Sequence, residues 1–189
     1  MDKLISVEGL VSLYDIKNDV WSKISESSNQ IQWSWGEIAC RLFGDGNPAY
    51  KISAMYIEFE NTALTPSTPT YTREAGVEYY ENLSLSGTKD FLRVPLLSVP
   101  SKTLASGYSN INFNRLTFLA QTSGTTGVHG RTFSDTVSSK VYGLALVATP
   151  AWSDRTQDLV FARKYYATGD QVNKQASSQI GVSWTETFK

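Results

Sequence analysis

Residue types that usually carry chemistry are scarce in this chain of 189 residues. It has a single cysteine, Cys40, and a single histidine, His129. One cysteine allows no internal disulfide, and these two residues cannot supply the three or four ligands of a zinc site. Any mechanism based on imidazole would depend on His129, which lies in the glycine-flanked stretch 127–130. A loop imidazole without a catalytic role is the simpler interpretation, so we expect no enzymatic activity, no cofactor and no metal ion.

An excess of charge of one sign and long hydrophobic runs are also missing. The 17 Lys and Arg residues balance the 18 Asp and Glu residues, and the basic residues do not form a run. Binding to nucleic acid needs several cations on one face to neutralise phosphates, so we expect no nucleic-acid partner. No apolar stretch approaches the roughly 20 residues of a membrane-spanning helix, so we expect no membrane partner.

Hydrophobic and aromatic residues, by contrast, are plentiful. Hydrophobic residues make up 41% of the chain, which is enough to build a core in a domain of this length. The ten Tyr and five Trp residues favour strands and contact surfaces.

The clearest pattern is an alternation of period two over residues 179–188. Ile180, Val182 and Trp184 fall on one side of it, and mostly small or hydroxyl-bearing residues fall on the other. Successive side chains of a strand point to opposite faces of a sheet, so the pattern predicts a strand with one buried face. Because this strand ends the chain, it must pair with an earlier segment.

Related patterns predict further strands over residues 50–60, 92–96, 111–119, 141–148 and 159–167. The segment 141–148 is apolar on both faces, as a central strand covered from both sides would be. Pro95 lacks a backbone donor, which places its strand at a sheet edge. The apolar parity changes within 111–119, which predicts a β-bulge near residues 114–115. The predicted core residues are Met55, Ile57, Phe59, Val141, Leu144, Leu146, Ile180, Val182 and Trp184.

Residues 34–44 are predicted to form one short helix, because Ser34 and Glu37 match a capping box. Residues 1–32 are expected to form an N-terminal arm or a short helix, since Leu13, Ile16 and Val20 have helical spacing. We expect this segment to contact a neighbouring subunit. The candidate interface residues are Leu13, Ile16, Val20, Trp21 and Trp152.

These elements indicate a mainly β protein. The predicted strands follow one another through polar loops, and no helix follows each strand, which disfavours a parallel α/β fold. The expected architecture is an antiparallel β-sandwich with jelly-roll or Greek-key wiring and one short N-terminal helix. The domain division is then an arm over 1–32 and a sandwich domain over 33–189.

Three segments resemble structural proteins of tailed-phage virions. They are EIACRLFGDGNPAYKISAMYIEFEN, GRTFSDTVSSKVYGLALVA and NKQASSQIGVSWTETF, and the resemblance spans residues 35–189. It implies a self-assembling β-sandwich without enzymatic activity or cofactor, located in the virion and assembled in the host cytoplasm. The implied partners are copies of the same chain and other virion proteins, namely the major capsid protein or tail and neck proteins.

The leading prediction is a capsid decoration (cement) protein that stabilises the head through contacts with its copies and with the capsid. A tail, neck or fibre-anchoring component is the alternative within the same class. A carbohydrate-binding β-sandwich module is the alternative outside it, because exposed aromatic rings can stack on sugars, and a glycan is then a candidate partner. A β-sandwich hydrolase comes third and would rest on carboxylate pairs such as Glu58 and Glu60.

Overall fold

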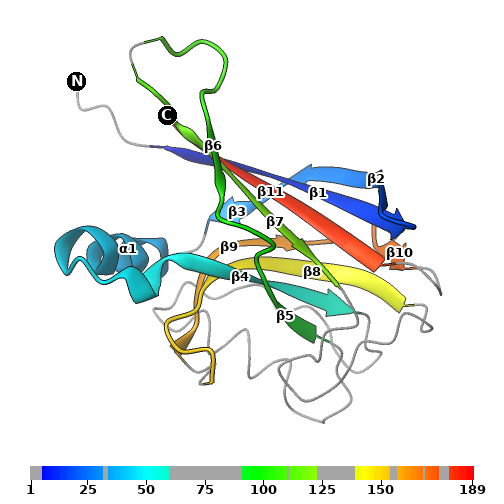
Figure 1. Cartoon of the computed structure of the whole chain (residues 1–189). Coiled ribbons are helices and arrows are strands. Elements are labelled where there is room, and N and C mark those ends of the chain that lie inside the picture. Colours follow the sequence, from blue (N-terminus) through cyan, green and yellow to red (C-terminus); the bar gives the residue numbers. More distant parts are fainter. Residues whose placement is uncertain are drawn as a thin grey trace.

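The chain folds into two antiparallel β-sheets that lie one above the other (Figure 1). The computed structural model describes residues 6–31, 34–59, 91–109, 111–122, 139–153, 157–167, 169–174 and 179–189. Sheet A has the strand order β2-β1-β11-β7-β6, and sheet B has the order β3-β9-β8-β4-β5, with β10 paired to β8. The protein is therefore mainly β, and its sheets are antiparallel, as the alternating patterns predicted.

The strands of sheet A are β1 (Val7–Lys17), β2 (Val20–Ser28), β6 (Ser101–Thr103), β7 (Arg115–Gln121) and β11 (Gln179–Phe188). The strands of sheet B are β3 (Gln30–Ile31), β4 (Ile52–Phe59), β5 (Phe91–Pro95), β8 (Ser139–Ala148), β9 (Leu159–Tyr165) and β10 (Val172–Lys174). The described helical elements are α1 (Ser34–Ala39), the π-helical turn η1 (Cys40–Gly44) and the 3₁₀ turn η2 (Pro48–Tyr50).

One hydrophobic core fills the space between the two sheets. Alternation along β11 points Ile180, Val182 and Trp184 toward sheet B, where they belong to the same buried cluster as residues of β4 and β8. Full burial of each such side chain stabilises the fold by about 1.5–3 kcal/mol. Eight of the predicted core residues are fully buried: Met55, Ile57, Val141, Leu144, Leu146, Ile180, Val182 and Trp184. The side chain of Phe59 lies outside the described part of the structure.

Sheet B is buried on both faces around its central strand, β8. Leu144 and Leu146 face sheet A, whereas Ala145 and Val147 pack on the opposite face in a second buried cluster with Tyr56. The pattern of apolar residues on both faces correctly indicated this central position. β5, which ends at Pro95, is an edge strand of the sheet.

The N-terminal segment differs from the arm or short helix expected from the sequence. β1 and β2 form a hairpin, and β1 pairs along its length with β11. Asn18 and Asp19 form the turn with φ values of 50° and 61°, a left-handed conformation that these residue types tolerate. Leu13 and Ile16 have helical spacing, but in a strand an odd and an even position face opposite sides. The described residues 6–31 thus belong to the sandwich, and the proposed boundary at residue 32 is corrected.

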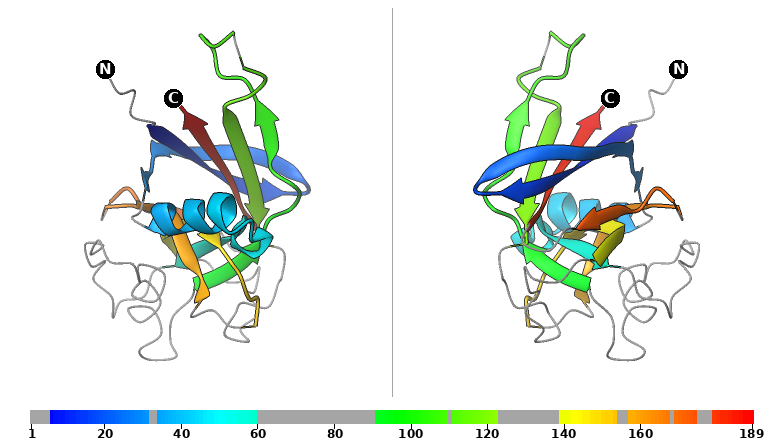
Figure 2. Two further views of the ribbon diagram at one scale, coloured as in Figure 1. Left: turned by 90° about the vertical axis from the view of Figure 1, so that its left-hand side faces the viewer. Right: turned by 90° about the vertical axis from the view of Figure 1, so that its right-hand side faces the viewer.

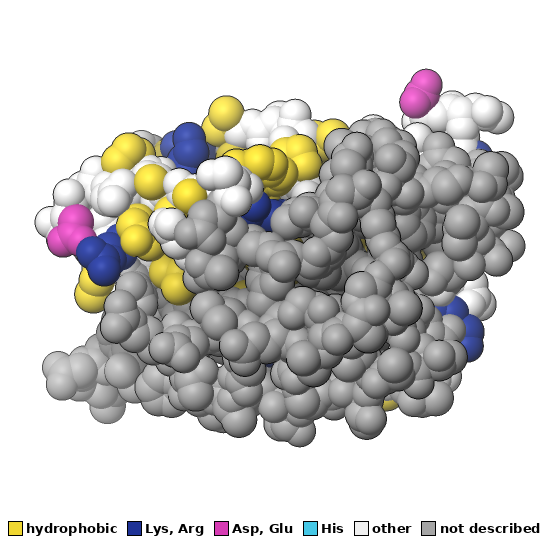
Figure 3. Space-filling view, turned by 90° about the horizontal axis from the view of Figure 1, so that it is seen from below, with side chains coloured by type: hydrophobic (Ala, Val, Ile, Leu, Met, Phe, Trp, Pro, Cys, Tyr) yellow, Lys and Arg dark blue, Asp and Glu magenta, His cyan; other side chains and the backbone are white. Residues whose placement is uncertain are grey.

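The helical residues close one end of the sandwich (Figure 2). Ile38 of α1 is fully buried in the core, and the Trp35 ring makes an edge contact with Phe161 at a centroid distance of 5.2 Å. Hydrophobic side chains gather on the surface at this end when the molecule is seen from the side of sheet B (Figure 3). The side chains of Ser34 and Glu37, which the predicted capping box needs, lie outside the described ones.

The two described ends of the chain lie side by side. The Lys189 backbone N–H donates to the Ser6 carbonyl at 2.9 Å, and the Ser6 N–H donates to the Lys189 carbonyl at 3.1 Å. The loop between β6 and β7 rises from the same region, beyond the edge of the sandwich (Figure 1). Within the described ranges, no helix is long and apolar enough to span a bilayer.

Candidate functional site

The residues predicted to form an interface lie in different environments. Leu13 is buried in the core and Ile16 is buried on the outer side of sheet A, so neither is available to a neighbouring subunit. That part of the prediction is corrected, because the segment is a strand of the sandwich. Val20 is exposed next to the hairpin turn, and Trp21 is half-buried. Trp152 is 51% exposed and lies in a different segment, after β8.

A buried arginine stacks on the ring of Trp152 and hydrogen-bonds to its backbone. The guanidinium carbon of Arg93 lies 4.5 Å from the centroid of the Trp152 ring. Arg93 Nη1 donates to the Trp152 carbonyl at 2.5 Å, and Nη2 donates to the Ala151 carbonyl at 3.0 Å. Stacking and hydrogen bonding therefore act on the same segment. The result is a half-exposed aromatic ring with a fixed orientation.

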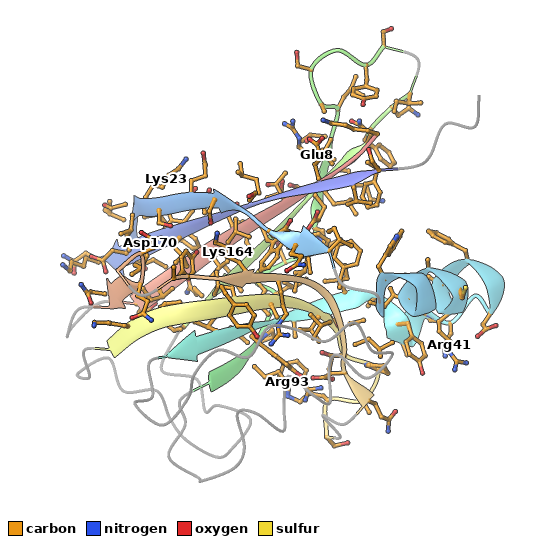
Figure 4. The ribbon with its side chains drawn as sticks, turned by 180° about the vertical axis from the view of Figure 1, so that it is seen from behind. Glu8, Lys23, Arg41, Arg93, Lys164 and Asp170 are labelled. Carbon is orange, nitrogen blue, oxygen red and sulfur yellow. The ribbon has the colours of Figure 1, made fainter. Side chains whose placement is uncertain are left out.

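Arg93 is itself fixed by an ion pair without exposed surface. Its Nη2 lies 2.5 Å from Asp158 Oδ1, and the Tyr56 hydroxyl donates to the other carboxylate oxygen. Burial raises the pKa of Asp158 to about 6, against the opposing effects of the Tyr56 hydrogen bond and the Arg93 charge. Figure 4 shows Arg93 on the side of sheet B that faces away from sheet A. Loss of one partner of such a pair would leave an unpaired charge in a buried position.

No pattern in the sequence indicates this ion pair. Arg93 alternates with the apolar Leu92 and Val94, a pattern that normally marks a solvent-facing side chain. Asp158 lies immediately before the predicted strand over 159–167, outside the segments with an alternating pattern. The register of β4 and β5 places Arg93 directly opposite Tyr56, on a face of sheet B that is buried and not solvated.

A second surface is the loop between β6 and β7, residues 104–114. Three of its apolar side chains are exposed, with Leu104 at 40%, Ile111 at 48% and Phe113 at 50%. The ammonium group of Lys102 lies 5.2 Å from the centroid of the Phe113 ring. Exposed apolar groups that cluster on one protruding loop are typical of an interaction site.

Asn114 anchors the base of this loop to the end of β11. Its Oδ1 accepts a hydrogen bond from the Ala105 backbone N–H at 2.9 Å, and its Nδ2 donates to the Phe188 carbonyl at 2.9 Å. The Phe188 N–H donates in turn to the Asn114 carbonyl at 2.9 Å. Asn114 is buried, so these bonds are shielded from competition by water. The loop therefore rises from a well-defined base.

A third surface is a groove of about 850 Å³ at the same end of sheet A. Hydroxyl-bearing side chains from neighbouring segments line it, namely those of Ser28, Thr103, Thr117, Thr185 and Thr187. The strand register explains their convergence, because Thr185 pairs with Thr117 and Thr187 pairs with Arg115. The hydroxyl oxygens of Thr117 and Thr185 lie 3.1 Å apart, and Arg115 Nε donates to Thr187 Oγ1 at 3.4 Å.

Glu8 and Arg115 supply charges of opposite sign to the groove. The Glu8 carboxylate forms an ion pair with the Lys189 ammonium group. Figure 4 shows Glu8 near the base of the loop between β6 and β7, so the groove and the loop share one end of the molecule.

A buried carboxyl group, Glu186, lies on the inner face of β11. Its Oε1 accepts hydrogen bonds from Trp184 Nε1 at 2.6 Å and from Asn29 Nδ2 at 2.5 Å. Its Oε2 has no hydrogen-bond partner among the described residues. Burial raises the pKa of Glu186 to about 7, although both hydrogen bonds lower it. A Cβ atom at Gly9 would lie 2.0 Å from the Asn29 amide, so this glycine provides the space for Asn29.

These surfaces are suited to contact and binding. In the part of the chain that the structure describes, no three His, Cys, Asp or Glu side chains gather to hold a metal ion. His129 and Glu60 lie outside the described residues, as does the side chain of Glu58. The chain matches no family model, no curated protein and no solved structure.

Proposed function

We propose that the chain is a non-enzymatic structural protein of a tailed-phage virion, of the capsid decoration (cement) type. It would stabilise the head by adhering to copies of itself and to capsid proteins. A tail, neck or fibre-anchoring role is the alternative within this class. The proposal includes jelly-roll or Greek-key wiring, and the position of β11 between β1 and β7, strands distant in sequence, supports it.

One observation carries the proposal: three apolar side chains of the β6–β7 loop are exposed beside its anchored base. Leu104, Ile111 and Phe113 would lose water-exposed area on contact with a partner, at about 25 cal/mol per Å² of apolar surface. The Asn114 bonds hold the base in place, which lowers the entropy cost of ordering the loop in a complex.

Trp152 offers a second contact on another side of the molecule. Trp and Arg are the residue types that contribute most often to binding energy in interfaces, and here Arg93 already orients the ring. Two contact surfaces that point in different directions suit a protein that bridges neighbours. The two exposed surfaces thus support adhesion as the function.

The test is a variant with Leu104→Ser, Ile111→Ser and Phe113→Ser combined. We expect the wild-type chain to self-associate in sedimentation velocity as its concentration rises, and the variant to stay monomeric. The melting temperature should change little, because the three side chains are at least 40% exposed. Phe43→Ser, at an exposed position at the helical end, is the matched control. Equal association of the variant and the wild type, or a wild type that is monomeric at every concentration, would contradict the proposal.

A further inference from the structure

The groove on sheet A lies beside the adhesive loop and has a chemistry of its own. We propose that this groove binds a neutral oligosaccharide. The inference depends on the hydroxyl groups that line the groove and not on the virion role. It also differs from stacking on Trp152, which lies in another part of the fold.

Threonine suits the surface of a sugar, because its side chain carries a hydroxyl and a methyl group side by side. Each hydroxyl has one donor and two acceptor sites. The bond between Thr117 and Thr185 uses one donor and one acceptor, so the pair retains one donor and three acceptors for a ligand. The threonine methyl groups and the exposed Leu10 offer apolar contacts to the C–H face of a sugar ring. The groove can therefore contact both the hydroxyl groups and the C–H face of a pyranose.

The charges of the groove favour an uncharged ligand. One carboxylate, Glu8, and one guanidinium, Arg115, line the groove, so neither sign dominates there. An anionic or cationic ligand would meet a charge of its own sign. The volume of about 850 Å³ lies in the usual range of about 300–1,000 Å³ for small-molecule sites.

The positions of the hydroxyl groups are set by the sheet before any ligand binds. Thr185 and Thr187 lie on β11, which is hydrogen-bonded to β1 on one side and to β7 on the other. Thr103 lies on β6, opposite Arg115 of β7. Side chains on paired strands lose little freedom on binding, which favours recognition of a ligand with many hydroxyl groups.

The experiment titrates the ¹⁵N-labelled chain with maltotriose, cellotriose or triacetylchitotriose at millimolar concentration and follows amide shifts by NMR. We expect at least one of these sugars to shift amides of β7 and β11. Thr117→Val and Thr185→Val keep the shape of the side chain and remove the hydroxyl. Each should weaken binding roughly fivefold, as expected for one net hydrogen bond. Ser183→Ala lies on the same face of β11 but not in the lining of the groove, and it should leave binding unchanged.

Two results would overturn the groove as a sugar site. One is the absence of shifts with all three trisaccharides. The other is binding that survives both threonine substitutions but is lost with Trp152→Ala, which would assign the sugar to the indole ring. The triple serine variant of the β6–β7 loop should still bind sugar, so failure of the adhesive role and failure of the sugar site can be told apart.

Discussion

Gly181 determines how side chains pack on the outer face of sheet A. The Trp21 ring, from β2, lies directly over it, together with Ile16 of β1. A Cβ atom at position 181 would lie 2.5 Å from Trp21 Cζ3 and 2.9 Å from Ile16 Cδ1. The Trp21 ring also makes an edge contact with Tyr14 at a centroid distance of 5.4 Å. The missing side chain thus allows an aromatic ring to cover the sheet.

Gly181→Ala should lower the free energy of unfolding by about 1–3 kcal/mol, the usual cost of overpacking. Trp21 would have to move away from the sheet, so its fluorescence should shift to the red. Urea denaturation measures the change in stability. Gly36→Ala is the matched control, because nothing lies within 4 Å of its Cβ position in α1 and alanine favours a helix. The packing argument fails if the two substitutions have the same effect.

Single residues were predictable from the sequence where alternation alone decides their position. The burial of Val182 and Trp184 follows from the period of two. Glu186 has the same parity as Val182 and Trp184, so it faces the core although it is a carboxylic acid. In the sequence it is visible only as a polar interruption of the apolar pattern. Its partner Asn29 lies 157 positions away in the chain, and no local pattern links the two.

Among the elements, the loop between β6 and β7 depends most on one side chain. Asn114 provides both a donor and an acceptor at its base, and both partners are backbone groups. Alanine at this position would leave the Ala105 N–H and the Phe188 carbonyl without these bonds. The loop would then lose its fixed relation to β11.

Asn114→Ala should cost about 1–3 kcal/mol of stability, because buried polar groups lose their partners. Hydrogen–deuterium exchange should become faster at the amide of Ala105. Asn173→Ala, at an exposed position in β10, should change neither quantity. Unchanged protection of Ala105 in the Asn114 variant would show that other contacts hold the loop.

The elements that the sequence predicted well are those with a long and regular pattern. β4, β8 and β11 follow the alternating or doubly apolar segments closely, and Pro95 correctly marked an edge strand. The β-bulge predicted near residues 114–115 is wrong. β7 begins at Arg115, and the change of apolar parity before it comes from exposed loop residues such as Phe113.

The hairpin of β1 and β2 was missed because two periods compete in the same residues. Leu13, Ile16 and Val20 fit a helix, whereas Val11 and Leu13 fit a strand. The Asn18–Asp19 pair was the sequence signal that could have decided between them, since these residue types favour a tight hairpin turn.

In the whole molecule, the buried Glu186 couples the stability of the sandwich to pH. Its pKa is raised from 4.5 to about 7 in the folded chain by burial, so the folded state holds a proton that the unfolded state releases. The contribution of Glu186 to the free energy of unfolding is therefore fully present below the unfolded pKa of 4.5. It falls as the pH rises to about 7. Above that pH the loss is constant, at about 3 kcal/mol.

Glu186→Gln should remove most of this dependence, because an amide does not ionise and its oxygen can still accept from Trp184 and Asn29. Urea denaturation at pH 5 and pH 8 gives the measurement. The wild type should lose more stability between the two pH values than the variant does. Glu8→Gln, at an exposed position, should behave like the wild type. Equal losses in all three chains would place the pH dependence elsewhere.

The candidate surfaces could be predicted from the sequence only in part. Trp152 stood out as an aromatic near the end of an element. The partners that fix it come from segments far apart in the chain, since Arg93 and Asp158 are separated by 65 positions. The hydroxyl face of residues 179–188 was visible as a pattern, but which strand lies beside it depends on sheet order. Pairing of Thr185 with Thr117 sets the groove, and only the folded chain shows it.

Backbone hydrogen bonds join Ser6 to Lys189, so the two described ends of the polypeptide lie next to each other. A fusion partner attached after Lys189 would emerge next to the β6–β7 loop and the groove of sheet A, and could mask both. A circular permutant opened at Asn18–Asp19 would move the free ends to the turn of the first hairpin. Tags placed there would leave the crowded end of the molecule clear.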